Sequence, residues 1–474
     1  MELEVNIDEA VALTLRPMRD GWPGGDSIVV HDAATRLSCG IEPSTPRNRI
    51  EAWLEHLVPE NGHRIEFESR ASRRMERLGY GPTVANIGRS LWGNADAEYT
   101  GKITLRAYDA KGRQVHVDTR NEYASVDDDE VGILVAAAGR IAEQGRMAPQ
   151  AKTVLRAHGL SGSRGKVCLR WNRAEQHWMI PKGSALSSHI LKEESSRAWL
   201  PAEAAIESYC QRALALAGIT AAATRARLYN TIATVVSART DRVDDMDGQP
   251  LGRTHQEEWS QAIGIHPYQK NDDRPDTDWR TLFRLLGTHG LRPEEEQQAL
   301  AKAIAGLTLI GCADTHRRNV GVQHVWGREG QKIVLAPLYD CSSIEGTEWA
   351  HDKRAIIPIG GEANFDEIKG RHWRRLAEAG GVDTSLVLNA VREIAERLPD
   401  ALRDAARETS EHDHAITPKA RNTRIEAISL HTVERCRRTI HELGTLEAAT
   451  QARTTVRTRA RPPWPTKPGP DFSL

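Results

Sequence analysis

The chain has 474 residues, of which 64 are basic and 65 acidic, so that its formal net charge is −1. This length indicates about two to four domains, and the balanced charge excludes a polyelectrolyte, so that any surface for nucleic acid must be local. The six cysteines show no CxxC spacing, which excludes a zinc module and a disulfide scaffold and favours a reducing cytoplasm. The acidic N-terminus and the shortness of the apolar runs predict neither a signal peptide nor a membrane span.

The N-terminal quarter of the chain predicts a small α+β subdomain. Apolar runs at Val11–Leu15 and Lys102–Leu105 are typical of strands, and a helical pattern covers Ile50–Leu57. Turns rich in glycine and proline, such as Pro23–Gly25, separate these elements. We therefore expect residues 1–125 to form one mixed subdomain.

A glycine-rich turn and three short apolar runs come next. The turn at 159–165 leads into Lys166–Trp171, and the runs Trp178–Pro181 and His189–Lys192 follow. Glycines let backbone N–H groups approach phosphate oxygens, although glycine-rich hairpins are more often plain turns. Residues 126–245 are therefore expected to form a sheet-bearing, nucleotide-binding lobe.

Helical patterns dominate the remaining sequence. Pro201 begins one predicted helix, and Pro293, followed by three glutamates, begins another that ends at Gly311. Two amphipathic segments follow, at about 384–408 and 423–446.

The residues most typical of a phosphotransferase lie near the end of the helix that starts at Pro293. Asp314 stands five residues before Asn319, and Asp340 follows a second apolar run. Polar side chains between apolar runs must be paired or bound to metal. An aspartate can orient a substrate hydroxyl, and asparagine and aspartate oxygens can hold Mg²⁺ on ATP. The pattern predicts a kinase with Asp314 as the catalytic residue and Asn319 and Asp340 as metal ligands, and Arg317 and Arg318 could offset phosphate charge.

A lysine and a glutamate complete the expected site. Lys192 ends a predicted strand behind the glycine-rich turn, where a kinase lysine contacts phosphate oxygens. Glu207 lies in the next helix beside Ile206 and Cys210 and is the natural partner of this lysine. Singly, such residues are usually solvated, but their order along the chain favours the kinase interpretation.

Two other interpretations of the acidic stretch are open. Asp314 and Asn319 can simply cap the turn after Gly311. Asp314 and His316 also match the DxH of a two-metal phosphoesterase, but the GD and GNH elements that would complete its metal set are absent from the sequence.

Residues 246–446 are expected to form a helical lobe with the catalytic and metal-binding residues, and 447–474 a basic, proline-rich, disordered tail. From Arg453 onward the sequence has five cationic residues and five prolines and cannot bury a core. The cationic residues could contact phosphates of DNA or RNA, weakly and without specificity, or remain solvated.

Together these motifs resemble the HipA family of serine/threonine kinases, the toxins of HipA/HipB toxin–antitoxin systems. The family's catalytic stretch reads D-x-H-x-x-N followed by Y-D, which is similar to Asp314, His316 and Asn319 followed by Tyr339 and Asp340. Other segments that resemble family motifs are Trp53–Glu60, Gly93–Leu105, Leu160–Lys166, Ile180–Gly183, Ser188–Lys192, Glu207–Cys210, Arg239–Arg242 and His255–Glu258.

The resemblance implies an α+β, HipA-like kinase fold with a small β-rich N-terminal domain, a sheet-bearing kinase lobe and a mainly helical C-terminal lobe. It implies ATP and Mg²⁺ as cofactors, with Asp314 catalytic, Asn319 and Asp340 on the metal, and Glu207 as the helix partner of the lysine. The nucleotide-binding residues that it implies are Ser161, Gly162, Ser163, Lys166, Lys192, Ala238, Arg239, Asp241 and His316.

The resemblance also implies partners. It suggests growth arrest by phosphorylation of a translation component, for which an aminoacyl-tRNA synthetase is the hypothesis, and a HipB-like helix-turn-helix antitoxin that binds operator DNA. The position of the family's autophosphorylated serine is occupied by Gly159 in this sequence. Ser161 and Ser163 are therefore the candidates for autophosphorylation. The hinge segment Ala238–Asp241 lacks the family's glutamate and aromatic residue. The alternative function is a HipA-like pseudokinase acting as an interaction or DNA-associated regulatory protein.

Overall fold

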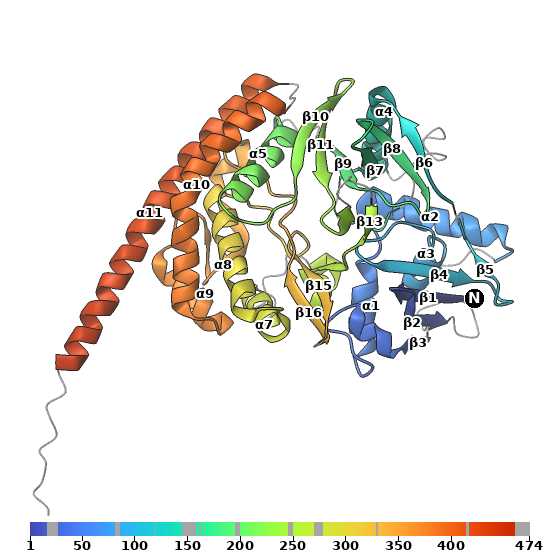
Figure 1. Ribbon diagram of the computed structural model, residues 1–474, viewed down its shortest axis with the longest axis horizontal. Coiled ribbons are helices and arrows are strands. Elements are labelled where there is room, and N and C mark those ends of the chain that lie inside the picture. The colour runs from blue at the N-terminus through green and yellow to red at the C-terminus, as the bar shows by residue number, and fades with distance from the viewer. Residues whose placement is uncertain are drawn as a thin grey trace, which may run out of the picture.

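The computed structural model describes residues 1–16, 27–80, 86–118, 120–144, 158–160, 162, 164–194, 200–244, 250–269, 278–328, 330–413 and 417–459. The fold is mixed α+β, as predicted. Figure 1 shows the N-terminal sheet at one end of the molecule, a second sheet in the middle and a helical lobe at the other end.

The N-terminal subdomain is an antiparallel sheet with helices packed on it. Its strand order is β3-β2-β1-β4-β5, and its core contains Leu3, Trp53 and Leu105, which confirms the predicted strands and the first helix. The elements are β1 (Glu2–Ile7), β2 (Ala10–Arg16), β3 (Ser27–Val30), α1 (Arg47–Glu55), α2 (Asn61–Arg77), α3 (Ile87–Trp92), β4 (Ile103–Tyr108) and β5 (Gln114–Val115).

The middle of the molecule is a six-stranded sheet with the order β10-β11-β9-β7-β8-β6. β6 lies before the expected boundary at residue 126, yet it pairs with β8 along its whole length. The elements of this sheet and the helix beside it are β6 (Asn121–Val126), α4 (Asp128–Gln144), β7 (Lys166–Asn172), β8 (His177–Gly183), β9 (His189–Glu193), β10 (Thr224–Tyr229) and β11 (Ile232–Ala238).

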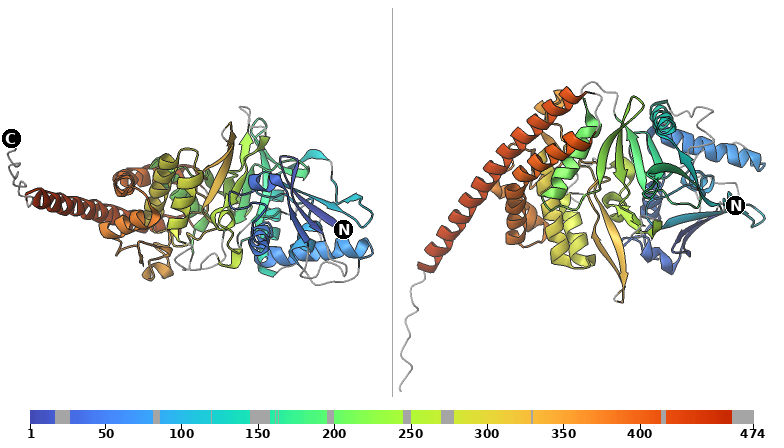
Figure 2. Two further views of the ribbon diagram at one scale, coloured as in Figure 1. Left: turned by 90° about the horizontal axis from the view of Figure 1, so that it is seen from below. Right: turned by 45° about the horizontal axis from the view of Figure 1, so that its top comes forward.

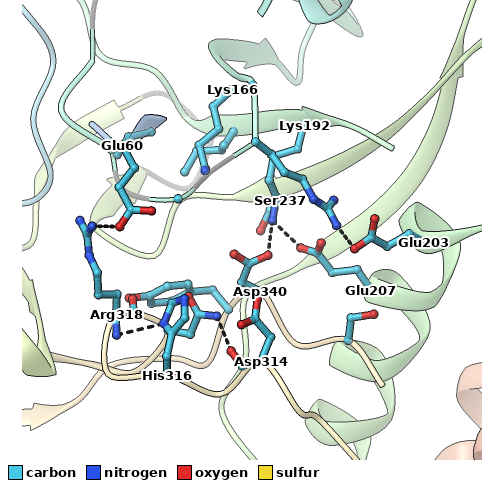
Figure 3. Close-up of a pocket in the computed structure, with 18 of the residues that line it drawn as sticks. Glu60, Lys166, Lys192, Glu203, Glu207, Ser237, Asp314, His316, Arg318 and Asp340 are labelled. Carbon is cyan, nitrogen blue, oxygen red and sulfur yellow. Dashed lines mark hydrogen bonds and ion pairs between the residues drawn. The ribbon is translucent and has the colours of Figure 1, made fainter. Parts of the chain in front are cut away.

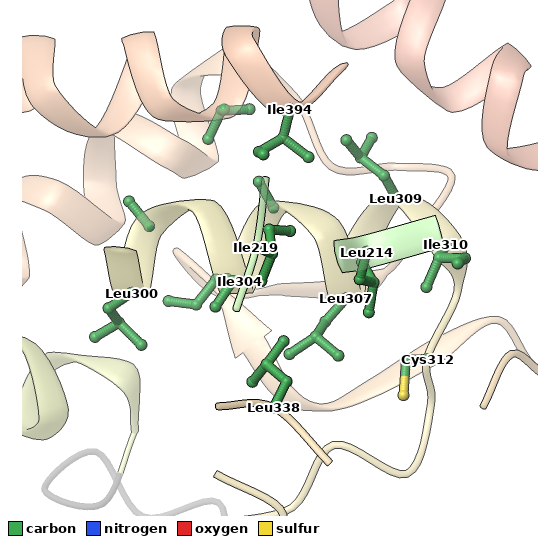
Figure 4. Close-up of a cluster of buried hydrophobic side chains, with 14 of the residues drawn as sticks. Leu214, Ile219, Leu300, Ile304, Leu307, Leu309, Ile310, Cys312, Leu338 and Ile394 are labelled. Atoms are coloured by element: carbon green, nitrogen blue, oxygen red, sulfur yellow. The ribbon is translucent and has the colours of Figure 1, made fainter. Parts of the chain in front are cut away.

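The helical lobe has the largest apolar core, which Figure 4 shows around one central helix. That helix is α8 (Pro293–Ile310), whose predicted start and end are confirmed, and Gly311 caps it with a left-handed backbone at φ 76°. Leu214 of α5 also lies in this core, so that α5 joins the sheet to the helices. The helices are α5 (Glu203–Leu216), α6 (Trp259–Ala262), α7 (Trp279–His289), α8, α9 (Gly370–Gly380), α10 (Thr384–His412) and α11 (Pro418–Arg459).

The prediction that helices dominate from Pro201 onward is wrong for several segments. In β10, for example, Arg225 and Arg227 alternate with Ala226, which is a strand period of two that the charged residues obscure. Besides β10 and β11, the strands in this region are β12 (Arg242–Asp244), β13 (Pro250–Arg253), β14 (Gln256–Glu258), β15 (Gly321–Gly327), β16 (Gly330–Leu335), β17 (Arg354–Ile359) and β18 (Glu362–Asn364).

The expected disordered tail also requires a correction. Residues 447–459 continue α11, which extends beyond the body of the molecule in both views of Figure 2. The sequence after Leu446 is rich in helix-forming residues and has no proline before Pro462, so that nothing stops the helix earlier. Residues 460–474 lie outside the described residues. None of the helices in the described part of the chain is both long and apolar enough to cross a membrane.

Candidate active site

A cavity of about 850 Å³ lies where the six-stranded sheet meets the helical lobe. Figure 3 shows charged side chains from both sides pointing into it. The predicted site residues that line the cavity are Gly162, Lys166, Lys192, Glu207, Ala238, Arg239, Asp241, Asp314, His316, Asn319 and Asp340. Ser161 and Ser163 lie outside the described residues.

Lys192 is the charged centre of this cavity. β9 carries it from the sheet, and its Nζ donates hydrogen bonds to Oε1 of Glu207 at 2.8 Å and to Oδ1 of Asp340 at 2.6 Å. Lys192 and Glu207 are both buried. Burial alone would lower the pKa of Lys192, but the charges of Asp340 and Glu207 outweigh it and raise this pKa above its ordinary value. The predicted lysine–glutamate pair is thus formed, with Asp340 as a third member.

Asp340 is held in an unusual backbone conformation. Its φ is +59°, in the left-handed region that aspartate adopts only rarely. The next residue fixes the turn, because the amide of Cys341 donates to Oε1 of Gln211 at 3.1 Å. Burial would raise the pKa of Asp340, but Lys192 and Lys166 outweigh it and hold this pKa well below its usual range. The carboxylate is therefore ionised at neutral pH.

Asp314 and Asn319 lie at the two ends of one tight turn after Gly311. Nδ2 of Asn319 donates to the backbone oxygen of Asp314 at 2.8 Å, and the amide of Asn319 donates to the backbone oxygen of His316 at 2.9 Å. The turn-capping interpretation is therefore correct for Asn319. Because Nδ2 of Asn319 makes this hydrogen bond, the amide oxygen of the same side chain points away from Asp314 O. Asp314 is exposed and lines the cavity.

Lys166 supplies a second cationic group beside Lys192. The two lysines are paired positions on the neighbouring antiparallel strands β7 and β9. Gly162 has φ +100°, a backbone conformation that favours glycine, and Nζ of Lys166 lies close to it. Burial and the charge of Lys192 lower the pKa of Lys166 to about 8.

The predicted hinge residues line the cavity, but two of their side chains are already paired. Arg239 is completely buried and contacts Asp241 at 2.9 Å and Glu98 of the N-terminal subdomain at 3.2 Å. Arg242 contacts the same two carboxylates, each at 2.8 Å. These ion pairs therefore join the N-terminal subdomain to the middle sheet. Of the predicted hinge residues Ala238, Arg239 and Asp241, Ala238 is the uncharged one that lines the cavity.

Several lining residues were missed by the sequence reasoning or given another role. Arg318 was expected to offset phosphate charge, but it is buried and paired with Glu60 and with Glu258, the latter at 2.6 Å. Arg164 of the glycine-rich turn pairs with Glu203 at the start of α5. Glu60 is the last residue of the segment Trp53–Glu60, which resembles a family motif. Its place in this motif was the sequence signal that could have indicated a role for Glu60 at the cavity.

The geometry defines a class of protein. A buried lysine bound to a helix glutamate and a downstream aspartate, below a glycine-rich turn and opposite an Asp–Asn turn, is the arrangement of a kinase-like nucleotide cleft. Residues 158–402, more than half of the chain, match the family model described as the HipA-like C-terminal domain. The chain belongs to the HipA-like family.

Two known proteins show the extent of the similarity. The protein Y4mE of Sinorhizobium fredii, which carries the name of a kinase, is 28% identical over 252 residues, and the match covers 53% of this chain and 58% of that protein. The structure of HipA from Shewanella oneidensis, solved with HipB and operator DNA, superposes with a TM-score of 0.71 at 18% identity, over 94% of this chain and 98% of that one. The second comparison establishes the common fold.

Proposed function

We propose that this chain is an ATP- and Mg²⁺-dependent protein serine/threonine kinase. The observation that carries the proposal is the pairing of Lys192 with both Glu207 and Asp340 in a cavity that Asp314 and Asn319 also line. Lys192 would contact the phosphates of ATP, and Asp314 would orient the substrate hydroxyl and accept its proton. His316, Gly162 and the other expected nucleotide-binding residues that line the cavity would surround ATP, and Ser161 and Ser163 remain proposed autophosphorylation sites.

Asn319 and Asp340 fit a magnesium ion that arrives with ATP. Mg²⁺ usually takes one or two carboxylates together with phosphate oxygens, and it prefers oxygen ligands. Asp340 supplies an ionised carboxylate. Asn319 supplies its side-chain amide oxygen, while the NH₂ group of the same amide donates to the backbone oxygen of Asp314. When bound, the metal would offset phosphate charge.

The pH dependence of nucleotide binding tests the position of Lys166. The pKa of this lysine is about 8, so that it loses its charge as pH rises above that value, whereas ATP keeps its full negative charge. We therefore expect ATP affinity to fall by about tenfold between pH 7.5 and 9.5, with proton uptake on binding in that range. Calorimetry in two buffers of different ionisation enthalpy measures both effects.

Two variants test whether Lys166 is the titrating group. Lys166→Met should remove the pH dependence of ATP binding, and Lys182→Met, on neighbouring β8, should retain it. An unchanged pH profile in Lys166→Met would contradict the assignment to Lys166.

We further propose a toxin-type role, in which the kinase arrests growth by phosphorylating a translation component such as an aminoacyl-tRNA synthetase. Support comes from family membership, and the homologue from Shewanella was crystallised with HipB and operator DNA. A HipB-like antitoxin is accordingly the proposed partner. We also propose the division into subdomains at 1–125, 126–245 and 246–446, except that β6, which pairs with β8, belongs to the second subdomain.

Radiolabelled ATP and a panel of purified synthetases test the substrate proposal. The expected result is label on one synthetase with the wild-type chain and none with Asp314→Asn. If none of the synthetases is labelled although the chain binds ATP, the synthetase hypothesis is refuted, and the kinase hypothesis stands with another substrate. A chain that binds ATP without transferring phosphate to any protein would be the pseudokinase.

A further inference from the structure

The turn 314–319, which carries the proposed catalytic aspartate, contains a buried arginine. Arg318 is 1% exposed, and its Nε donates to Oε2 of Glu258 at 2.6 Å. Its Nη1 donates to Oε1 of Glu60, and Figure 3 shows the Arg318 side chain reaching across to this carboxylate. The guanidinium group therefore bridges two carboxylates that come from different parts of the chain.

The backbone of Arg318 links this side chain to both loops of the site. The amide of Arg318 donates to Nδ1 of His316 at 3.3 Å, within the turn 314–319. The backbone oxygen of Arg318 accepts a hydrogen bond from the hydroxyl of Tyr339 at 2.8 Å. Tyr339 directly precedes Asp340, the proposed metal ligand. A shift of Arg318 would therefore displace the turn 314–319 and the loop of Asp340 together.

The N-terminal subdomain reaches Arg318 through residues 56–60, the connection between α1 and α2. Glu60 contacts the guanidinium group directly. His56, which is also buried, lies with its Nδ1 at 2.8 Å from Oε2 of Glu258 and with its Nε2 at 2.9 Å from the backbone oxygen of Ile265. One short segment of this subdomain therefore contacts both the arginine and its second carboxylate.

The charges in this group are mutually stabilised. Burial would raise the pKa of Glu258, but Arg318 and His56 outweigh it and hold this pKa well below its usual range. Burial would likewise lower the pKa of Arg318, but Glu258 and Glu60 outweigh it and raise this pKa above its ordinary value. Removal of the charge of Glu60 would leave the buried guanidinium group with one carboxylate in place of two, and the contact that spans the subdomains would be weakened.

We propose that Glu60 is a positioning residue for phosphotransfer, which fixes the turn 314–319 through Arg318 and makes the N-terminal subdomain part of the active site. Its effect on the rate rests on the proposed function. Glu60 would act on the placement of the carboxylate of Asp314, without contact to the reacting atoms. A misplacement of about 1 Å at reacting groups can lower a rate by about 100-fold, so that a loosened turn should lower kcat.

Hydrogen exchange of the full chain, followed by mass spectrometry, tests the positioning without any assay of activity. Within the turn, the amide of His316 donates to the oxygen of Asp314 at 3.0 Å, and the amide of Asn319 donates to the oxygen of His316 at 2.9 Å. In Glu60→Gln, which keeps the size of the side chain and removes its charge, these amides should exchange at least about tenfold faster than in the wild type. The amides of α8 should exchange as in the wild type.

Glu55→Gln is the matched control. Glu55 pairs with Arg64 at 2.9 Å inside the same subdomain, and its side chain is 17% exposed against 14% for Glu60. Its loss should leave exchange in the turn 314–319 unchanged. Equal exchange of the turn in Glu60→Gln and the wild type would overturn the proposal, as would faster exchange throughout the chain. If Glu60→Gln does not fold, Glu60→Asp, which keeps the charge and shortens the side chain, takes its place.

Kinetics distinguish positioning from a direct contact with ATP. Glu60→Gln should lower kcat by about 10–100-fold and leave the KM for ATP within about twofold, whereas Glu55→Gln should change neither by more than about twofold. In an Arg318→Lys background, which keeps the charge without the planar fork, the Glu60 substitution should lower kcat by less than about threefold more. Additive losses in the double variant would refute action through Arg318. If the wild type transfers no phosphate, the proposed function fails, and hydrogen exchange still decides the positioning of the turn.

Discussion

Asp314→Asn is expected to lower phosphotransfer by about 10²–10⁴-fold, because the amide keeps the size of the side chain and cannot accept the hydroxyl proton. Asp314 is exposed at the edge of the cavity, and asparagine matches it in size, so that folding should be unchanged. ATP affinity should also remain within about twofold, since Lys192, Asn319 and Asp340 are intact. Steady-state kinetics and calorimetry measure the two quantities.

Asp352→Asn is the matched control for this substitution. Asp352 is an exposed carboxylate that lines the same cavity and has no assigned role in the chemistry. Its loss should change the rate by less than about threefold. A rate in Asp314→Asn within tenfold of the wild type would contradict the role of Asp314 as the proton acceptor.

Arg239→Met is expected to lower the free energy of unfolding by about 3–5 kcal/mol, because it leaves the two buried carboxylates of Glu98 and Asp241 with one arginine, Arg242, in place of two. Burial would raise the pKa of Asp241, but Arg239 and Arg242 outweigh it and hold this pKa well below its usual value. The stabilisation from a lowered carboxylate pKa is present above the unfolded-state value of about 3.9 and is lost as pH falls through the folded-state value. Urea unfolding at a series of pH values from about 7 down to about 2.5 measures how much of this contribution is lost below about pH 4.

Arg173→Met provides the comparison for a cation outside this network. Arg173 is 59% exposed and lies 4.0 Å from Asp244, an ion pair of the surface type worth about 0–1 kcal/mol. In the Arg239 variant the pKa of Asp241 would rise. The difference in unfolding free energy between neutral and acidic pH should therefore be smaller in this variant than in the wild type. Equal unfolding free energies for the two variants would show that the buried network does not hold the subdomains together.

Local sequence patterns were sufficient for much of the fold and of the site. Pro293 and Gly311 delimit α8 because proline and glycine have strong backbone preferences at helix ends. Asp314, Asn319 and Asp340 stood out because they are polar residues between apolar runs. The pairing of Lys192 with Glu207 followed from their order along the chain.

The parts that were missed depend on contacts between distant residues. Glu60 and Arg318 are 258 positions apart, and no periodicity in the sequence connects them. Arg239 and Glu98 likewise meet only after the subdomains have packed. Short strands such as β10, with arginine at two of its six positions, carry too little apolar pattern to identify alone.

Transfer of phosphate from ATP to protein is the most direct test of the proposed kinase. The wild-type chain and Asp314→Asn, each with Mg²⁺ and [γ-³²P]ATP, are added to a cell extract whose own kinases have been inactivated by an alkylating ATP analogue. The proposal predicts phosphoserine or phosphothreonine on at least one protein with the wild type alone. Equal labelling with both chains, while calorimetry shows that the wild type binds ATP, would contradict kinase activity and leave a nucleotide-binding protein.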